Sequence, residues 1–123
     1  MSADRLAPFK IIENDRIPTP RYFDEEFYKA ENERLWPHVW QMATRLECIP
    51  EVGDYVVYEN LGKQVIVVRT KDGVKAFHNA CRHRGAPVCE AGRGKASRFV
   101  CPYHAWSYDR QGRLVGMYGK DTF

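Results

Sequence analysis

Two short segments rich in metal-ligating side chains constrain this chain more than any other part of its sequence. They read Cys81-Arg82-His83-Arg84-Gly85 and Cys101-Pro102-Tyr103-His104. Residues i and i+2 of an extended backbone point the same way, so Cys81 and His83 are expected to face one site. The spacing of Cys101 and His104 needs a tight turn, which Pro102 favours through its fixed φ. Because thiolate and imidazole together suit zinc or iron–sulfur chemistry, we expect the fold to bring the two segments together at a metal centre.

The pattern of apolar and turn residues around these segments predicts a mainly β, antiparallel domain. Two β-branched runs, at 54–58 and 64–69, flank a turn sequence at 60–63 and predict a hairpin. Further strands are predicted over 39–44, 74–78, 97–100, 106–108 and 113–115. Each ligand segment follows a predicted strand, so the ends of two strands are expected to carry the four candidate ligands.

The N-terminal third of the chain has a different character. Residues 1–20 hold three prolines without a clear hydrophobic period and are expected to form an arm. One helix is predicted within residues 21–37, because Asp24 is a good N-cap and Pro37 disfavours helical geometry at the residue before it. The β domain is then expected to occupy residues 38–123.

Composition and charge exclude several classes of function. A length of 123 residues fits one domain, and a net charge of +3 gives no reason to expect a nucleic-acid partner. No stretch is long and apolar enough to cross a bilayer, so we expect no membrane partner, and the first residues lack the apolar core of a secretion signal. Four cysteines in such a chain indicate metal or redox chemistry in the cytoplasm rather than disulfides.

The order C-x-H followed by C-x-x-H is the ligand pattern of Rieske proteins, and the likeness extends beyond the ligands. The matching segments include Arg84-Gly85, Ala105-Trp106-Ser107-Tyr108-Asp109, Pro20-Arg21-Tyr22-Phe23-Asp24 and Gly53-Asp54-Tyr55. Over about residues 15 to 120, the chain resembles the N-terminal Rieske domain of the α subunit of Rieske non-haem iron oxygenases. These oxidoreductases are the aromatic-ring-hydroxylating dioxygenases, which serve aromatic hydrocarbon catabolism, and related monooxygenases.

The resemblance implies that Cys81, His83, Cys101 and His104 bind a Rieske 2Fe–2S cluster. Both cysteines would hold one iron and both histidines the other, with the histidine-bound iron nearer the surface. Two neutral imidazoles in place of two thiolates make the site less negative than a four-cysteine site, which raises its reduction potential.

Two positions after the last ligand bear on how that potential is set. Respiratory-chain Rieske subunits have a serine two residues after the last histidine, where it donates a hydrogen bond to a bridging sulfur. This chain has Trp106 there, while Tyr108 matches an accompanying tyrosine. We therefore expect a potential toward the low end of the Rieske range, and we interpret Trp106 as a shield of the cluster.

The resemblance also implies partners. A reductase or ferredoxin would donate electrons, and the catalytic domain of a neighbouring α subunit, in a trimer, would receive them at a mononuclear non-haem Fe(II). That iron needs two histidines and a carboxylate, whereas only His38 and His78 remain here without a paired-histidine motif. We therefore expect a truncated chain that lacks the final strands of the domain and does not catalyse oxygenation alone. The alternative is a complete Rieske ferredoxin, although simple ferredoxins begin almost at the first strand.

Several residues keep more ordinary interpretations. A structural zinc site is the alternative for the four ligands. Cys89 is interpreted as a packing thiol, Cys48 has no assigned role, and His38 and His78 are expected to be structural or solvent-facing. A basic rim is either merely solvated or a docking surface for an acidic donor; it consists of Arg82, Arg84, Arg93, Lys95 and Arg98.

Overall fold

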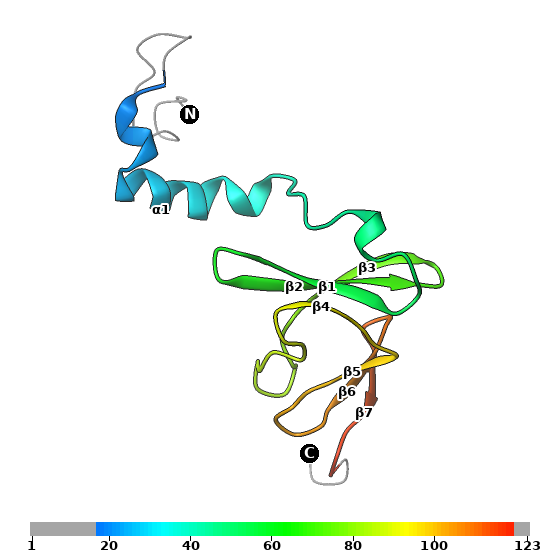
Figure 1. The fold of residues 1–123 in the computed structure, drawn as a ribbon. Helices are drawn as coiled ribbons and strands as arrows, with labels where there is room; N and C mark the ends of the chain where they lie inside the picture. Colours follow the sequence, from blue (N-terminus) through cyan, green and yellow to red (C-terminus); the bar gives the residue numbers. More distant parts are fainter. Residues whose placement is uncertain (1–16, 120–123) are drawn as a thin grey trace. The chain divides into compact units, whose positions relative to one another are not determined.

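The computed structural model describes residues 17–119 (Figure 1). The chain divides into two compact units, one ending at Gln41 and the other beginning at Met42, and each is described by itself. The predicted arm at 1–20 lies for the most part outside the described residues. Among residues 17–119, no helix has the length and apolar character that a membrane span requires.

The first unit contains the α-helix α1, Glu25–Arg34. The Asp24 carboxylate accepts a hydrogen bond from the Phe27 N–H at 2.9 Å, so Asp24 is the N-cap that the sequence predicts. Short 3₁₀ turns at Thr19–Tyr22 and Trp36–His38 flank the helix. The α-helix is therefore shorter than the 21–37 segment, and it ends before Pro37.

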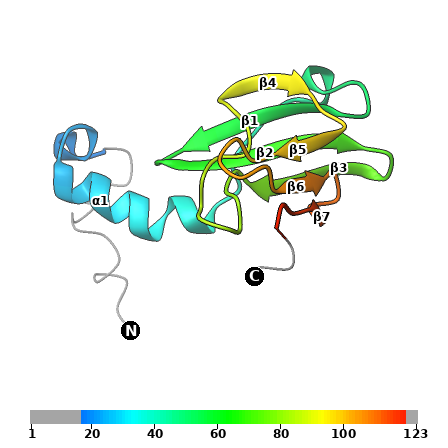
Figure 2. The same cartoon turned by 90° about the horizontal axis from the view of Figure 1, so that it is seen from below.

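The second unit contains two antiparallel sheets. The larger has the order β3-β2-β1-β4, and Figure 2 shows its strands from below. Its strands are β1 (Asp54–Asn60), β2 (Lys63–Thr70), β3 (Gly73–His78) and β4 (Gly92–Lys95). The turn between β1 and β2 consists of Leu61 and Gly62 with φ of 53° and 70°. A two-residue turn with both φ positive is the geometry that tight hairpins favour.

The smaller sheet has the order β5-β6-β7. Its strands are β5 (Arg98–Val100), β6 (Ser107–Asp109) and β7 (Leu114–Gly116). These strands and the β1–β2 and β2–β3 hairpins lie where the sequence predicts them, so the expectation of a mainly β antiparallel domain with one helix is confirmed. The buried core of this unit is drawn from both sheets and includes Val57, Ile66, Val68, Phe99 and Tyr108.

Two strand predictions are wrong. Residues 39–44 form no strand, and Trp40 and Met42 are 103% and 81% exposed, so burial of these apolar side chains does not stabilise one. Conversely, β4 pairs with β1 although its sequence, Gly-Arg-Gly-Lys, has no strand pattern. A Cβ at Gly94 would lie 2.7 Å from the Tyr55 hydroxyl oxygen. The glycine therefore lets the Tyr55 ring cross β4, a long-range contact that local propensity does not encode.

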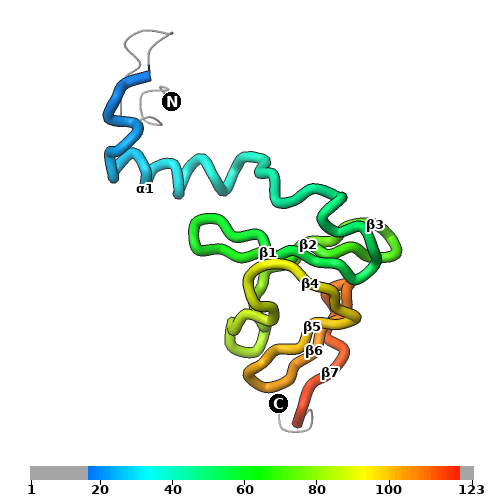
Figure 3. Tube along the Cα trace, viewed as in Figure 1, coloured from blue at the N-terminus to red at the C-terminus, as the bar shows by residue number. Residues whose placement is uncertain are grey.

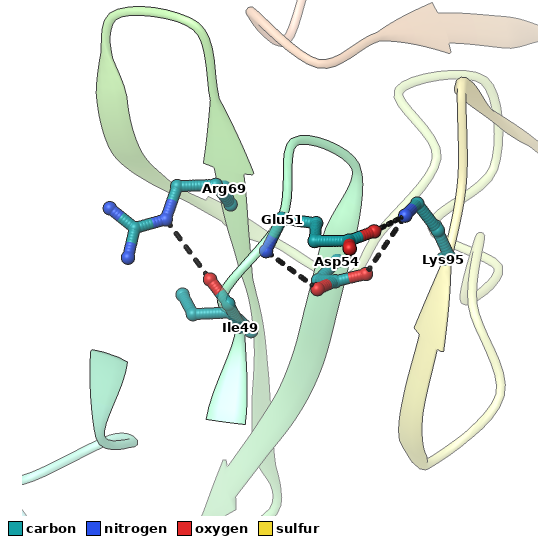
Figure 4. Close-up of polar contacts among 5 residues, drawn as sticks. All are labelled: Ile49, Glu51, Asp54, Arg69 and Lys95. Atoms are coloured by element: carbon teal, nitrogen blue, oxygen red, sulfur yellow. Dashed lines mark hydrogen bonds and ion pairs between the residues drawn. The ribbon is translucent and has the colours of Figure 1, made fainter. Parts of the chain in front are cut away.

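The loop before β1 is tied to the sheet by polar contacts (Figure 4). The Arg69 Nε donates to the Ile49 carbonyl at 3.0 Å, and the Glu51 N–H donates to Asp54 Oδ2 at 2.8 Å. Lys95 of β4 forms ion pairs with Glu51 and Asp54. Exposed ion pairs contribute little to stability, so the hydrogen bond to the buried Ile49 is the stronger anchor of this loop.

Candidate metal centre

The first ligand loop, between β3 and β4, is closed by backbone hydrogen bonds at Cys81. The Cys81 N–H donates to the Ala86 carbonyl at 2.7 Å, and the Cys81 carbonyl accepts from the Gly85 N–H at 2.7 Å. Residues 82–84 form a turn. The expectation of extended backbone at this segment is therefore wrong: the chain folds back on itself, and His83 occupies the turn rather than the next position of a strand.

The second ligand loop, between β5 and β6, repeats the same hydrogen-bond pattern. The Cys101 N–H donates to the Trp106 carbonyl at 2.8 Å, and the Cys101 carbonyl accepts from the Ala105 N–H at 3.0 Å. Residues 102–104 form the tight turn that the sequence predicts. The fifth residue of each loop, Gly85 or Ala105, has a left-handed φ of 74° or 58°. Both cysteines therefore begin turns of the same shape, despite the different spacing of their histidines.

The four candidate ligands form two pairs, one of thiols and one of imidazoles, and the loops that carry them run side by side in the chain trace (Figure 3). The cysteines are 3% and 2% exposed, and the Cys101 thiol hydrogen-bonds with the Cys81 thiol. His83 is half-buried and His104 is exposed, with ring centroids 4.7 Å apart. Among the described residues, no three potential metal ligands gather at one point. The arrangement is a buried thiol pair beneath an outer imidazole pair.

Hydrogen bonds at Cys81 favour its thiolate. The Tyr108 oxygen accepts from the Arg82 N–H at 3.0 Å, which leaves its own proton to donate to the Cys81 sulfur, 3.3 Å away. Burial raises the pKa of Cys81, but the hydrogen bonds from Tyr108, the backbone of His83 and Arg84, and Cys101 outweigh it. The pKa of this thiol therefore lies below its ordinary value, which favours the thiolate form.

Aromatic side chains cover the imidazole pair. The Trp106 ring stacks on His83 with centroids 4.9 Å apart and planes 14° from parallel. The Tyr103 ring lies 4.1 Å from that of His104, and the Arg84 guanidinium lies over Tyr103 at 5.3 Å. These contacts join the two loops. The outer face is a hollow of about 640 Å³ that both imidazoles help to line.

The remaining cysteines and histidines lie apart from this pairing. Cys89 packs against the core, and burial raises its pKa to about 11, against a smaller opposite effect of the hydrogen bond with Tyr55. It is the packing thiol that the sequence predicts, and both Cys89 and Cys48 are free of disulfides. His38 and His78 are exposed.

Asn79, which no sequence pattern singled out, is 5% exposed and hydrogen-bonds across the first loop. Its only signal was its place, two residues before Cys81.

The donor set fits an iron–sulfur cluster with two iron ions. Such a cluster takes two ligands on each iron, and thiolate with imidazole is the Rieske combination. The thiols lie in the core, where burial excludes solvent, while the imidazoles reach the outer face.

Comparisons with known proteins identify the family of this chain. The Rieske [2Fe-2S] domain family matches residues 39–122. The benzene 1,2-dioxygenase α subunit of Pseudomonas putida is 39% identical over 110 residues, which are 88% of this chain and 24% of that protein. The glycine betaine monooxygenase oxygenase subunit of Chromohalobacter salexigens is 38% identical over 80% of this chain and 22% of its own length.

A solved structure of naphthalene 1,2-dioxygenase from Rhodococcus sp. bound to indole superposes with a TM-score of 0.80. It is 44% identical, and the match covers 86% of this chain and 24% of that one. The chain thus spans about a quarter of the length of these relatives. On the match of its family model over residues 39–122 and on its fold, the chain belongs to the Rieske [2Fe-2S] domain family.

Proposed function

We propose that this chain transfers single electrons through a Rieske 2Fe–2S cluster bound by Cys81 and Cys101 at one iron and by His83 and His104 at the other. The observation that carries the proposal is the buried thiol pair beneath the outer imidazole pair, formed by two loops of one shape. The cluster, when bound, supplies a centre that accepts and releases one electron. The residues around it position that centre and set its potential.

The surroundings favour electron exchange at the histidine side. His104 is exposed, so a partner can approach its imidazole, whereas both cysteines lie in the core. Trp106 covers one face of His83 and keeps water from it. Arg82 and Arg84 are exposed beside the imidazoles and make this rim positive. We expect the rim to attract an acidic reductase or ferredoxin, with an association rate that falls as salt is added.

We further propose that this chain acts as the N-terminal domain of an oxygenase α subunit. Its electrons would pass to a mononuclear iron in the catalytic domain of a neighbouring subunit in a trimer, in the cytoplasm. The likeness to oxygenase subunits named for benzene and for glycine betaine supports this role. Both relatives match this chain over most of its length although their names differ in substrate, so we propose that substrate choice is made outside the matched residues.

The decisive experiment is chemical analysis and EPR of the purified chain. We expect iron and acid-labile sulfide in equal amounts, together with a Rieske-type EPR signal after dithionite reduction. Cys81→Ser and His104→Ala should abolish that signal, whereas the matched variants Cys48→Ser and His78→Ala should keep it. Bound zinc without sulfide would refute the cluster, and loss of signal in the matched variants would refute the ligand assignment.

The reduction potential tests the role of position 106. Trp106 offers no hydroxyl to a bridging sulfur, so we expect a value toward the low end of the Rieske range of about −150 to +300 mV. Redox titration followed by EPR measures it. A value near the upper end would contradict the interpretation.

A further inference from the structure

Asn79 is a buried amide whose side chain uses all of its hydrogen-bonding positions. Its Oδ1 accepts from the Val88 N–H at 2.9 Å and from the Cys89 N–H at 3.0 Å. Its Nδ2 donates to the Cys89 carbonyl at 2.8 Å and to Gln64 Oε1 at 2.9 Å. An amide side chain offers two donors and two acceptor sites, so this one is fully satisfied in a residue that is 5% exposed.

These bonds close the neck of the first ligand loop. Asn79 follows β3, while Val88 and Cys89 lie nine and ten residues further along. Cys81 and His83 lie within the segment that is closed in this way. The bond to Gln64, together with the bond from the Asn79 N–H to the Gln64 carbonyl at 2.9 Å, fixes the neck to β2.

Sheet topology explains why the first loop needs a side chain for this purpose. The second loop is bounded by β5 and β6, which pair directly, with Val100 opposite Ser107. That ladder holds the two ends of the second loop together. The first loop is bounded by β3 and β4, which lie at opposite edges of the sheet in the order β3-β2-β1-β4. Strand pairing therefore cannot hold the two ends of the first loop together, and the hydrogen bonds of the Asn79 amide do so instead.

We propose that Asn79 is a positioning residue that holds the first ligand loop in its binding shape before the cluster is inserted. This inference rests on the proposed function, since it assumes that Cys81 and His83 are ligands. Closing a loop costs chain entropy. Because Asn79 already holds the loop closed in the folded protein, that entropy is lost on folding and not when the cluster binds. Residues that orient metal ligands contribute about ten- to a hundredfold to metal affinity.

The test compares Asn79→Ala with Thr70→Val in the full chain. Thr70 is a matched control because it is also buried, at 3% exposure, and its hydroxyl makes two hydrogen bonds, in the β2–β3 turn. We expect Asn79→Ala to release iron to a chelator about ten- to a hundredfold faster and to broaden and shift the EPR line of the reduced cluster. Thr70→Val should lower thermal stability but leave the EPR line shape and the release rate unchanged.

A purely structural role for Asn79 would reduce the amount of folded protein while leaving the line shape and release rate of the remainder at the wild-type values. That result would overturn the proposal. If Asn79→Ala does not fold, Gln64→Ala removes one of the four bonds and should accelerate release to a smaller extent. An unchanged rate in Gln64→Ala would then overturn it.

Hydrogen exchange on the cluster-free chain separates this inference from the proposed function. In Asn79→Ala, we expect exchange at the Val88 and Cys89 amides to accelerate at least tenfold more than at the amides that join β1 and β2. A wild-type chain that binds no cluster would refute the proposed function, but the exchange measurement would still test whether Asn79 holds the first loop closed. Uniform acceleration of exchange, or none, would refute that role of Asn79.

Discussion

Replacing Tyr108 by phenylalanine should lower the reduction potential of the cluster. The Tyr108 oxygen accepts from the Arg82 N–H at 3.0 Å, so its proton is directed to the Cys81 sulfur at 3.3 Å. Reduction adds negative charge to the cluster and its sulfur ligands, and a hydrogen bond to a charged group contributes about 1.5–3 kcal/mol. If about 1 kcal/mol of this appears only on reduction, the potential falls by about 40 mV, since about 1.4 kcal/mol corresponds to about 59 mV for one electron.

The same variant should also unfold more easily. It removes the acceptor of the hydrogen bond that the Arg82 N–H donates, and such a bond contributes about 0.5–1.5 kcal/mol to the free energy of unfolding. Redox titration by EPR and urea unfolding measure the two effects. Tyr55→Phe is the matched control, because its hydroxyl is hydrogen-bonded to Cys89, which is not a proposed ligand. An unchanged potential in Tyr108→Phe, or an equal fall in Tyr55→Phe, would refute the reasoning.

Three further predictions concern stability and thiol reactivity. Ala105→Gly should raise the free energy of unfolding by about 0.5 kcal/mol in urea, because a left-handed φ of 58° strains alanine by more than glycine loses in chain entropy; a fall would contradict this. Burial opposes ionisation of Asp109, but hydrogen bonds from Arg113 outweigh it and hold its pKa below the ordinary value. Asp109→Ala should therefore lower the free energy of unfolding by about 1 kcal/mol at neutral pH. This difference from the wild type should disappear as the pH falls and Asp109 becomes protonated in the folded state. A difference that does not change with pH would contradict this prediction. Iodoacetamide at mildly alkaline pH should label the exposed Cys48 and spare Cys89, whose pKa is about 11. Equal labelling of the two cysteines, measured by mass spectrometry, would show that Cys89 is not buried in this way.

Local sequence signals were sufficient for the parts of this fold that form between near neighbours. The β1–β2 hairpin is encoded by β-branched runs on either side of a glycine-containing turn, and its register follows from that turn. Asp24 caps α1 through a bond to a residue only three positions away. The four candidate ligands were likewise evident, because thiol and imidazole at short spacing are chemically distinctive wherever they stand.

Contacts between distant segments decided the rest. β4 pairs with β1, and Gly94 leaves room there for the Tyr55 side chain, whereas residues 39–44 form no strand. The turn at Cys81 depends on backbone bonds to Gly85 and Ala86, which a two-residue period does not reveal.

The candidate metal centre shows the same division. Sequence alone determined that this chain carries two thiol–imidazole segments, each following a strand. Only the tertiary structure decided that the first segment folds as a turn rather than a strand, and that Asn79 closes the first loop. The physical reason is that β3 and β4 lie at opposite edges of one sheet. No local pattern records which strands pair, and therefore none records which loop needs a side chain to hold its ends together.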